Sequence, residues 1–232
     1  MNEMARGLDR RGFTALWMLT TGLGWALVPL TPLQSEFRTY AEIVRQLPVY
    51  ALVGLLLGVT TGLGQALVWR LQGQPAAQWW WASALGYGVA LPLALIGFTL
   101  IPSFFSALRG QNPFFLPFSD PGSTEFFALP QTLALCGGIV GAAQWLALRR
   151  LLPRSTLSMA LLWVFGAWLS LSLGLGLGAY VRQFVSGFGW PEIVPGIMGR
   201  TVAGAAIGVL TGVLLIGLMH EARRLSDLAL AL

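Results

Sequence analysis

The stretch GVTTGLGQALVWR occupies residues 58–70, and the stretch GGIVGAAQWLALR occupies residues 137–149. Five residues agree between them at a constant offset of 79 positions, without a gap. Both stretches close a long apolar run, so the chain contains a repeated membrane unit. The shared residues are Gly58, Gly62, Gln65, Leu67 and Arg70 in the first copy, and Gly137, Gly141, Gln144, Leu146 and Arg149 in the second.

The composition assigns the chain to the membrane. Of its 232 residues, 56% are hydrophobic and only 10% are charged, and its mean hydropathy is +0.71. Soluble domains carry about 25% charged residues. Apolar windows of roughly 20 residues, the length that crosses a bilayer core, recur along the chain. The longest stretch outside them is too short for a soluble domain, so residues 1–232 form a single transmembrane domain.

The apolar windows predict an all-α, polytopic transmembrane helical bundle with six spans. Each span is long enough to cross a hydrocarbon core of about 30 Å. The first follows three arginines and resembles a signal peptide, but no small-residue cleavage site comes after it, which favours an uncleaved helix. The predicted spans are residues 13–30, 48–69, 79–101, 128–148, 157–180 and 196–219.

Arginine, the only basic residue type other than the single histidine, sets the orientation. With the N-terminus inside, nine arginines lie on the inner side and five on the outer side. Because cytoplasmic segments carry the excess of basic residues, both termini are predicted to be cytoplasmic. This describes a multi-pass protein of a bacterial inner (cytoplasmic) membrane or a thylakoid membrane. The net charge of +5 is explained by these membrane-surface arginines, so no nucleic-acid partner is expected.

The spans alternate between two kinds. Spans two, four and six carry stripes of glycine, and spans one and three share a Trp followed by a Leu-Gly-aromatic element, at Trp17 with Leu23-Gly24-Trp25 and at Trp79 with Leu85-Gly86-Tyr87. Span five matches them loosely through Phe165-Gly166. The chain is therefore predicted to consist of three parallel hairpin repeats. The third is the most diverged, with Thr211 at the glutamine position and Ile216 at the arginine position.

Two outer connections and the start of span three carry many apolar or aromatic side chains. Residues 33–47 have the periodicity of an amphipathic helix on the outer surface. Residues 102–127 form a Phe-rich loop, which is expected to enter the membrane interface or pack on another subunit. Trp79, Trp80 and Trp81 are expected to form an aromatic belt at the inner interface.

The glycine stripes predict close helix packing. Residues four apart share one helix face, and small residues there let two backbones approach. The alternative is a groove that admits a flat ligand such as a pigment ring or a lipid tail. The packing residues are Gly58, Gly62, Gly137, Gly141, Gly204, Gly208 and Gly212.

Three polar side chains are candidates for cofactor binding. Gln65 and Gln144 lie five residues before an arginine, about 7.5 Å in from the inner surface. Each amide either forms an interhelical hydrogen bond or binds a chlorophyll-type pigment or a lipid head group. His220, at the cytoplasmic end of span six, is either a charge partner of the helix C-terminus or a magnesium-porphyrin ligand.

The residues that catalysis and ion transport require are scarce. No acidic or basic residue lies at the centre of a span, which argues against a proton relay or an ion-coupled carrier. The chain has no nucleophile elbow, zinc-protease helix or phosphate loop. With one cysteine, Cys136, and one histidine, neither a disulfide nor a multi-ligand metal site is expected within the chain.

The stretch at residues 137–150, with its Gly-x3-Gly-x2-Gln-Trp-Leu pattern and Arg149-Arg150 ending, resembles uncharacterised polytopic membrane proteins. These are frequent in cyanobacteria and other phototrophic bacteria. The resemblance covers residues 54–92 and 133–180, and Ala66 replaces the tryptophan in the first copy. It implies a helical membrane protein from a bacterium, with a link to phototrophy, and it transfers no functional residue.

Three functions fit these features. The first is a non-enzymatic accessory or scaffold subunit of a larger bacterial bioenergetic or photosynthetic membrane complex, in contact with lipid, other membrane subunits and a chlorophyll-type pigment or bound lipid. The second is a carrier or channel for a neutral or apolar solute, which the repeats favour. The third is a lipid-active membrane enzyme that uses His220, Glu221 and nearby arginines.

Overall fold

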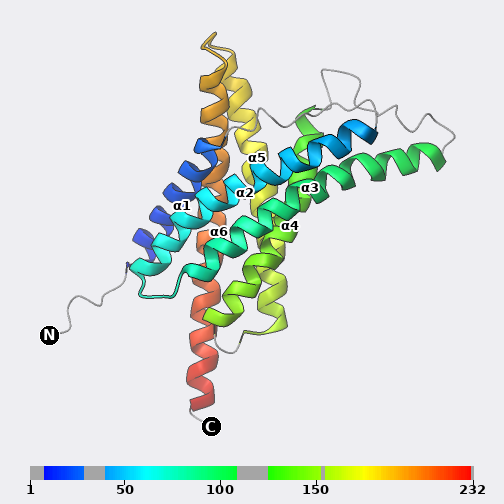
Figure 1. Cartoon of the computed structure of the whole chain (residues 1–232). Helices are drawn as coiled ribbons and strands as arrows, with labels where there is room; N and C mark the ends of the chain where they lie inside the picture. Colours follow the sequence, from blue (N-terminus) through cyan, green and yellow to red (C-terminus); the bar gives the residue numbers. More distant parts are fainter. Residues whose placement is uncertain (1–7, 29–39, 109–124, 153–154, 231–232) are drawn as a thin grey trace.

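The computed structural model describes residues 8–28, 40–108, 125–152 and 155–230, and these form six α-helices. The prediction of an all-helical protein is confirmed, and each helix overlaps one predicted span (Figure 1). The helices are α1 (Arg10–Leu27), α2 (Tyr40–Leu71), α3 (Ala77–Leu108), α4 (Glu125–Leu151), α5 (Leu157–Ser186) and α6 (Ile193–Leu230).

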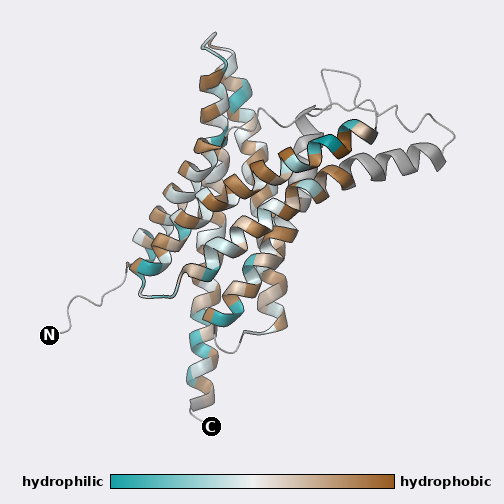
Figure 2. Ribbon diagram, viewed as in Figure 1, coloured by the Kyte–Doolittle hydropathy of each residue, from teal (hydrophilic) through white to brown (hydrophobic). Residues whose placement is uncertain are grey.

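Four segments of these helices are long and apolar enough to cross a membrane: Ala41–Leu71, Ala77–Gly97, Leu157–Ser186 and Ile193–Ala229. The chain is therefore a helical membrane protein. Large apolar side chains such as Leu23, Leu63 and Leu173 are exposed on the outside of the bundle, as a surface facing lipid requires. Figure 2 shows apolar residues along the helices and polar residues gathered near several helix ends.

The helices form a closed ring. Each packs against its neighbours in sequence, and α1 also packs against α6. Among the described residues, no other pair of helices has backbones packed closely together, but Trp17 of α1 meets Trp79 of α3, and Trp79 meets Trp163 of α5, at the centre of the ring. The first residue of α1 and the last residue of α6 lie at the same, lower end of the bundle in Figure 1. All six helices border the central axis of the ring, and the candidate site lies on this axis.

Local sequence explains several of the helix ends. The Asp9 side chain accepts a hydrogen bond from the Gly12 amide at 2.8 Å and caps the start of α1. Thr156 caps α5 in the same way through the Met159 amide. The turns that follow α2 and α5 contain Gly73 and Gly189, with φ of 72° and 70°, a backbone region that favours glycine.

The predicted surface helix at 33–47 is wrong over the part that the structure describes. Residues 40–47 form the first two turns of α2, which continues through Pro48 to Leu71. Proline is tolerated within long membrane helices because neighbouring groups satisfy the freed carbonyl. Residues 33–39 lie outside the described residues.

The predicted loop at 102–127 is also shorter than expected. Helix α3 extends to Leu108 and α4 starts at Glu125, so both ends of the segment are helical. The remaining residues, 109–124, lie outside the described residues. The Pro and Phe content that suggested a loop does not prevent helix formation at its two ends.

Candidate functional site

The predicted glycine stripes lie at three interfaces of the ring. A Cβ atom added to Gly62 of α2 would lie 3.0 Å from the Cα atom of Trp80 on α3. The equivalent distances are 3.1 Å from Gly141 of α4 to Val164 on α5, and 2.7 Å from Gly208 of α6 to Met18 on α1. Real Cβ contacts are seldom this short, so glycine is needed for these close approaches.

Each of these interfaces has a second contact of the same form. The same added Cβ atoms would lie 2.9 Å from the Cβ atom of Ser83, 2.9 Å from that of Ala167 and 3.0 Å from that of Thr21. Ser83, Ala167 and Thr21 each follow a tryptophan by four residues. The contacts thus relate Trp79 of α3, Trp163 of α5 and Trp17 of α1.

All three tryptophans are fully buried, which corrects the expectation for Trp79. Trp79 lies in the bundle interior rather than in an interfacial belt, while Trp81 of the same run is exposed. On α5 the residue that corresponds to Trp17 and Trp79 is Trp163, because Ala167 takes the place of Thr21 and Ser83 in the glycine contacts. The pattern Trp-x3-(Thr, Ser or Ala) at residues 17, 79 and 163 was the signal in the sequence that could have revealed this.

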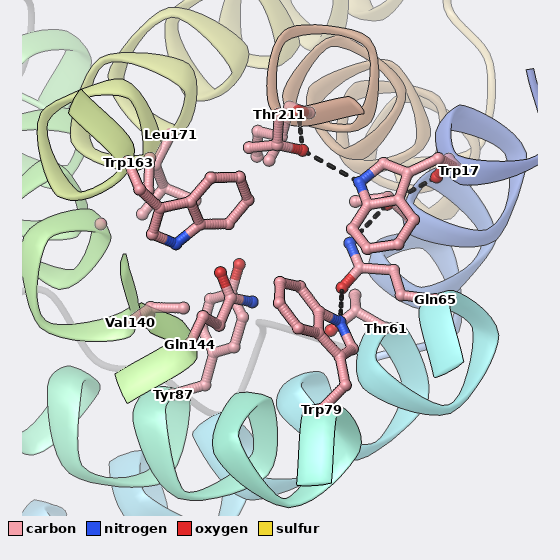
Figure 3. Close-up of a pocket in the computed structure, with 14 residues that line it drawn as sticks. Trp17, Thr61, Gln65, Trp79, Tyr87, Val140, Gln144, Trp163, Leu171 and Thr211 are labelled. Atoms are coloured by element: carbon pink, nitrogen blue, oxygen red, sulfur yellow. Dashed lines mark hydrogen bonds between the residues drawn. The ribbon is translucent and has the colours of Figure 1, made fainter. Parts of the chain in front are cut away.

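Gln65 lies at the centre of a hydrogen-bond network. Its Oε1 atom accepts from the Trp79 indole at 2.9 Å, and its Nε2 atom donates to Thr21 Oγ1 at 2.9 Å (Figure 3). Thr21 in turn donates to the Trp17 carbonyl, and the Trp17 indole donates to Thr211 Oγ1 at 3.1 Å. Both ends of the Gln65 amide are engaged by protein groups, as the interhelical alternative requires.

Gln144 and Trp163 are the equivalents of Gln65 and Trp79 at the α4–α5 interface, but they do not bond in the same way. Gln144 Nε2 donates to Ser83 Oγ at 3.0 Å, as Gln65 donates to Thr21. The Trp163 indole N–H is buried and has no acceptor within the part of the chain that the structure describes. An unsatisfied buried donor costs about 1–3 kcal/mol, so this N–H requires an explanation.

These residues line one cavity at the centre of the ring, with contributions from all six helices. The centre of a water-sized sphere can occupy about 20 Å³ of it, so the cavity has room for water. The volume is far too small for a porphyrin ring. Its lining includes Trp17, Thr21, Gln65, Trp79, Gln144, Trp163, Ala167, Ile207 and Thr211.

Two buried apolar clusters lie on either side of this polar layer. One contains Trp25, Tyr87 and Ile207, and the other contains Trp69, Leu148 and Leu215 with the three buried tryptophans. The rings of Trp17, Trp79 and Trp163 follow one another at centroid distances of 5.4 and 5.9 Å. The cavity is therefore a polar layer within an apolar core.

The remaining candidate residues lie away from the cavity. His220 is exposed and does not line the cavity. Helix α6 continues beyond it to Leu230, so the expectation that His220 pairs with a helix C-terminus is wrong. Its neighbour Glu221 pairs with Arg224 at 2.9 Å. Within the described ranges, no three His, Cys, Asp or Glu side chains come together as a metal site. Binding of pigment or lipid by Gln65, Gln144 or His220 stays a prediction.

Comparison with known proteins identifies no relative. No protein-family model, no curated protein and no solved structure matches this chain.

Proposed function

We propose that this chain is a non-enzymatic, six-span membrane protein that serves as an accessory or scaffold subunit of a larger bacterial bioenergetic or photosynthetic membrane complex. The observation that carries the proposal is the closed interior. Gln65, Gln144 and the indoles of Trp17 and Trp79 bond to protein groups between two apolar clusters, and the cavity among them has room only for water-sized molecules. Such an interior suits a protein that acts by binding other membrane subunits on its outer surface.

The proposed architecture is three hairpins of one orientation, α1–α2, α3–α4 and α5–α6, with both termini in the cytoplasm. The three matching glycine contacts support the repeat, because each joins the second helix of one hairpin to the first helix of another. The arginine distribution supports the orientation. Arg70, Arg149 and Arg224 mark the end of the bundle that we assign to the cytoplasm.

Helix α5 is the proposed docking surface for a partner helix. Only 28% of its most apolar window is buried inside the bundle, compared with 44% for α6 and 50% for α2 and α3. Its exposed side chains recur about every four residues, so successive ones lie side by side in a stripe that winds around the helix. The stripe consists of Leu157, Leu161, Phe165, Leu169, Leu173, Leu177 and Phe184.

A photo-crosslinking experiment in native membranes tests this proposal. A benzophenone amino acid at Leu173 on α5 should crosslink to one defined membrane protein. The matched control is Leu63 on α2, which has similar exposure, 51% against 54%, and should crosslink to lipid only. Purification from the same membranes then yields the partner and a visible absorption spectrum. A chain that purifies alone, without pigment and with only lipid adducts at both positions, would rule the proposal out.

A carrier or channel for a neutral solute is the second candidate, and the central cavity favours it. Its lining combines amide, hydroxyl and indole groups with apolar side chains and contains no charged residue. Proteoliposomes under an osmotic gradient of water, urea or glycerol provide the test, read by light scattering. Permeability above that of protein-free vesicles, and lost in a Gln144→Leu variant, would favour transport over the scaffold role.

A further inference from the structure

The three tryptophans face three polar acceptors in a cyclic arrangement. Trp79 of α3 donates to Gln65 of α2, and Trp17 of α1 donates to Thr211 of α6. In both cases the bond crosses an interface where a glycine stripe packs against the tryptophan's helix. The third interface of this form joins α4 to α5, and there the corresponding pair is Gln144 and Trp163.

The third bond of the cycle is missing. Trp163 has no acceptor among the described groups, although its ring and the Gln144 amide both face the cavity (Figure 3). The indole N–H groups of Trp25 and Trp69 are likewise buried without a hydrogen-bond acceptor in the described chain, but neither residue lines the cavity. Trp163 is therefore the tryptophan whose orphan donor faces internal space.

Two small side chains account for that space. Gln65 and Gln144 each donate to a hydroxyl on the first helix of their own hairpin, at Thr21 and Ser83. In the third hairpin, Thr211 stands at the position of the glutamine and Ala167 at the position of Thr21 and Ser83. The long amide and the hydroxyl to which it donates are therefore both absent. Thr211 and Ala167 line the cavity beside Trp163. The diverged repeat thus leaves a gap where the other two repeats have side-chain atoms.

We propose that this gap is a binding site for a neutral, water-sized molecule that accepts the Trp163 N–H and bridges it to the polar groups of Gln144 and Thr211. The ligand is uncharged because the lining holds no ionised group to balance a charge in an apolar core. It is small because only about 20 Å³ of the cavity is open to the centre of a water-sized sphere. It must hydrogen-bond because the donor that it meets is otherwise unsatisfied. The inference is independent of the accessory-subunit proposal.

Nuclear magnetic resonance of the full-length protein in lipid nanodiscs, labelled with ¹⁵N at the indole nitrogens, tests the site with water as the probe. A Trp163→Phe variant assigns the Trp163 signal. We expect magnetisation transfer from bound water to the Trp163 indole N–H. We expect none to Trp79, whose N–H is bonded to Gln65, and none to Trp69, whose N–H is away from the cavity.

A variant that fills the cavity provides a second test of the site. Thr211→Gln combined with Ala167→Ser restores the side chains of the other two repeats and should abolish the water contact of Trp163, while the Trp79 signal stays in place as a sign of native folding. The proposal is overturned if the Trp163 N–H shows no more water contact than that of Trp69, or if the contact persists in the folded double variant. The comparison between Trp163 and Trp69 needs no cavity variant, so it decides the question even if the double variant does not fold.

Discussion

The indole N–H of Trp79 donates to the carbonyl oxygen of Gln65 at 2.9 Å and so joins α3 to α2 inside the bundle. The amide nitrogen of the same glutamine donates to Thr21 of α1 at 2.9 Å. One side chain therefore connects three helices. Because both bonds are buried, the alternative for each group is an unsatisfied polar atom in an apolar core.

A double-mutant cycle between Gln65→Leu and Trp79→Phe should measure this bond. Polar bonds between membrane helices contribute about 0.6 kcal/mol on average and about 1.7 kcal/mol at most, so the coupling energy should fall within that range. Unfolding in SDS-containing mixed micelles, followed by circular dichroism, gives the stabilities. Gln65→Leu paired with Trp25→Phe is the control, because the described hydrogen bonds of Gln65 go to Trp79 and Thr21 and none joins it to Trp25. Equal coupling in the two cycles would contradict the assigned bond.

Adjacent glycines in α4 should respond oppositely to the same substitution. A Cβ at Gly137 would lie 2.7 Å from the Trp168 Cα atom, whereas one at Gly138 would meet nothing within 4 Å. Gly137→Ala should destabilise the bundle by about 1–3 kcal/mol through overpacking. Gly138→Ala should be neutral or stabilising, because alanine has the higher helix propensity. The same unfolding assay measures both, and a similar loss in the two variants would argue against close α4–α5 packing.

The sequence predicted the helices and the two glutamines because both leave local signals. A run of apolar residues is visible without knowledge of its partners, and the match between residues 58–70 and 137–149 directed attention to Gln65 and Gln144. The glycine positions were also informative, since close approach in a membrane requires small residues at fixed spacing. These features depend on one segment at a time.

The burial of Trp79 and Trp163 could not be predicted from one segment at a time. A tryptophan near a helix end suits both a membrane interface and a protein core, because its ring is apolar and its N–H is polar. Only the position of the neighbouring helices decides between the two. The same limit applies to α2, which begins at Tyr40 and not at residue 48, since Ile43 is buried in one cluster with Ala94 and Leu95 of α3.

Thr211→Val should reveal the acceptor role of Thr211. This change removes the oxygen that accepts the Trp17 N–H and should lower stability by about 0.6 kcal/mol, and by at most about 1.7 kcal/mol. Thr61→Val is the matched control. Both hydroxyls are buried and donate to the carbonyl four residues earlier, at 2.7 Å for Thr211 and 2.6 Å for Thr61, but no tryptophan donates to Thr61 among the described hydrogen bonds. A larger loss from Thr61→Val would remove the evidence for a special role of Thr211.

Cysteine labelling should establish the orientation of the hairpins. Gln78 in the first turn of α3 and Ser186 at the end of α5 are both exposed, and they lie at opposite ends of the bundle. Cys136 is buried, so the native chain serves as an unreactive background for a membrane-impermeant maleimide. If both termini are cytoplasmic, Ser186→Cys reacts in intact spheroplasts, and Gln78→Cys reacts only after the membrane is opened. The reverse pattern would place both termini outside, and labelling of both sites in intact spheroplasts would contradict the transmembrane arrangement of α3 and α5.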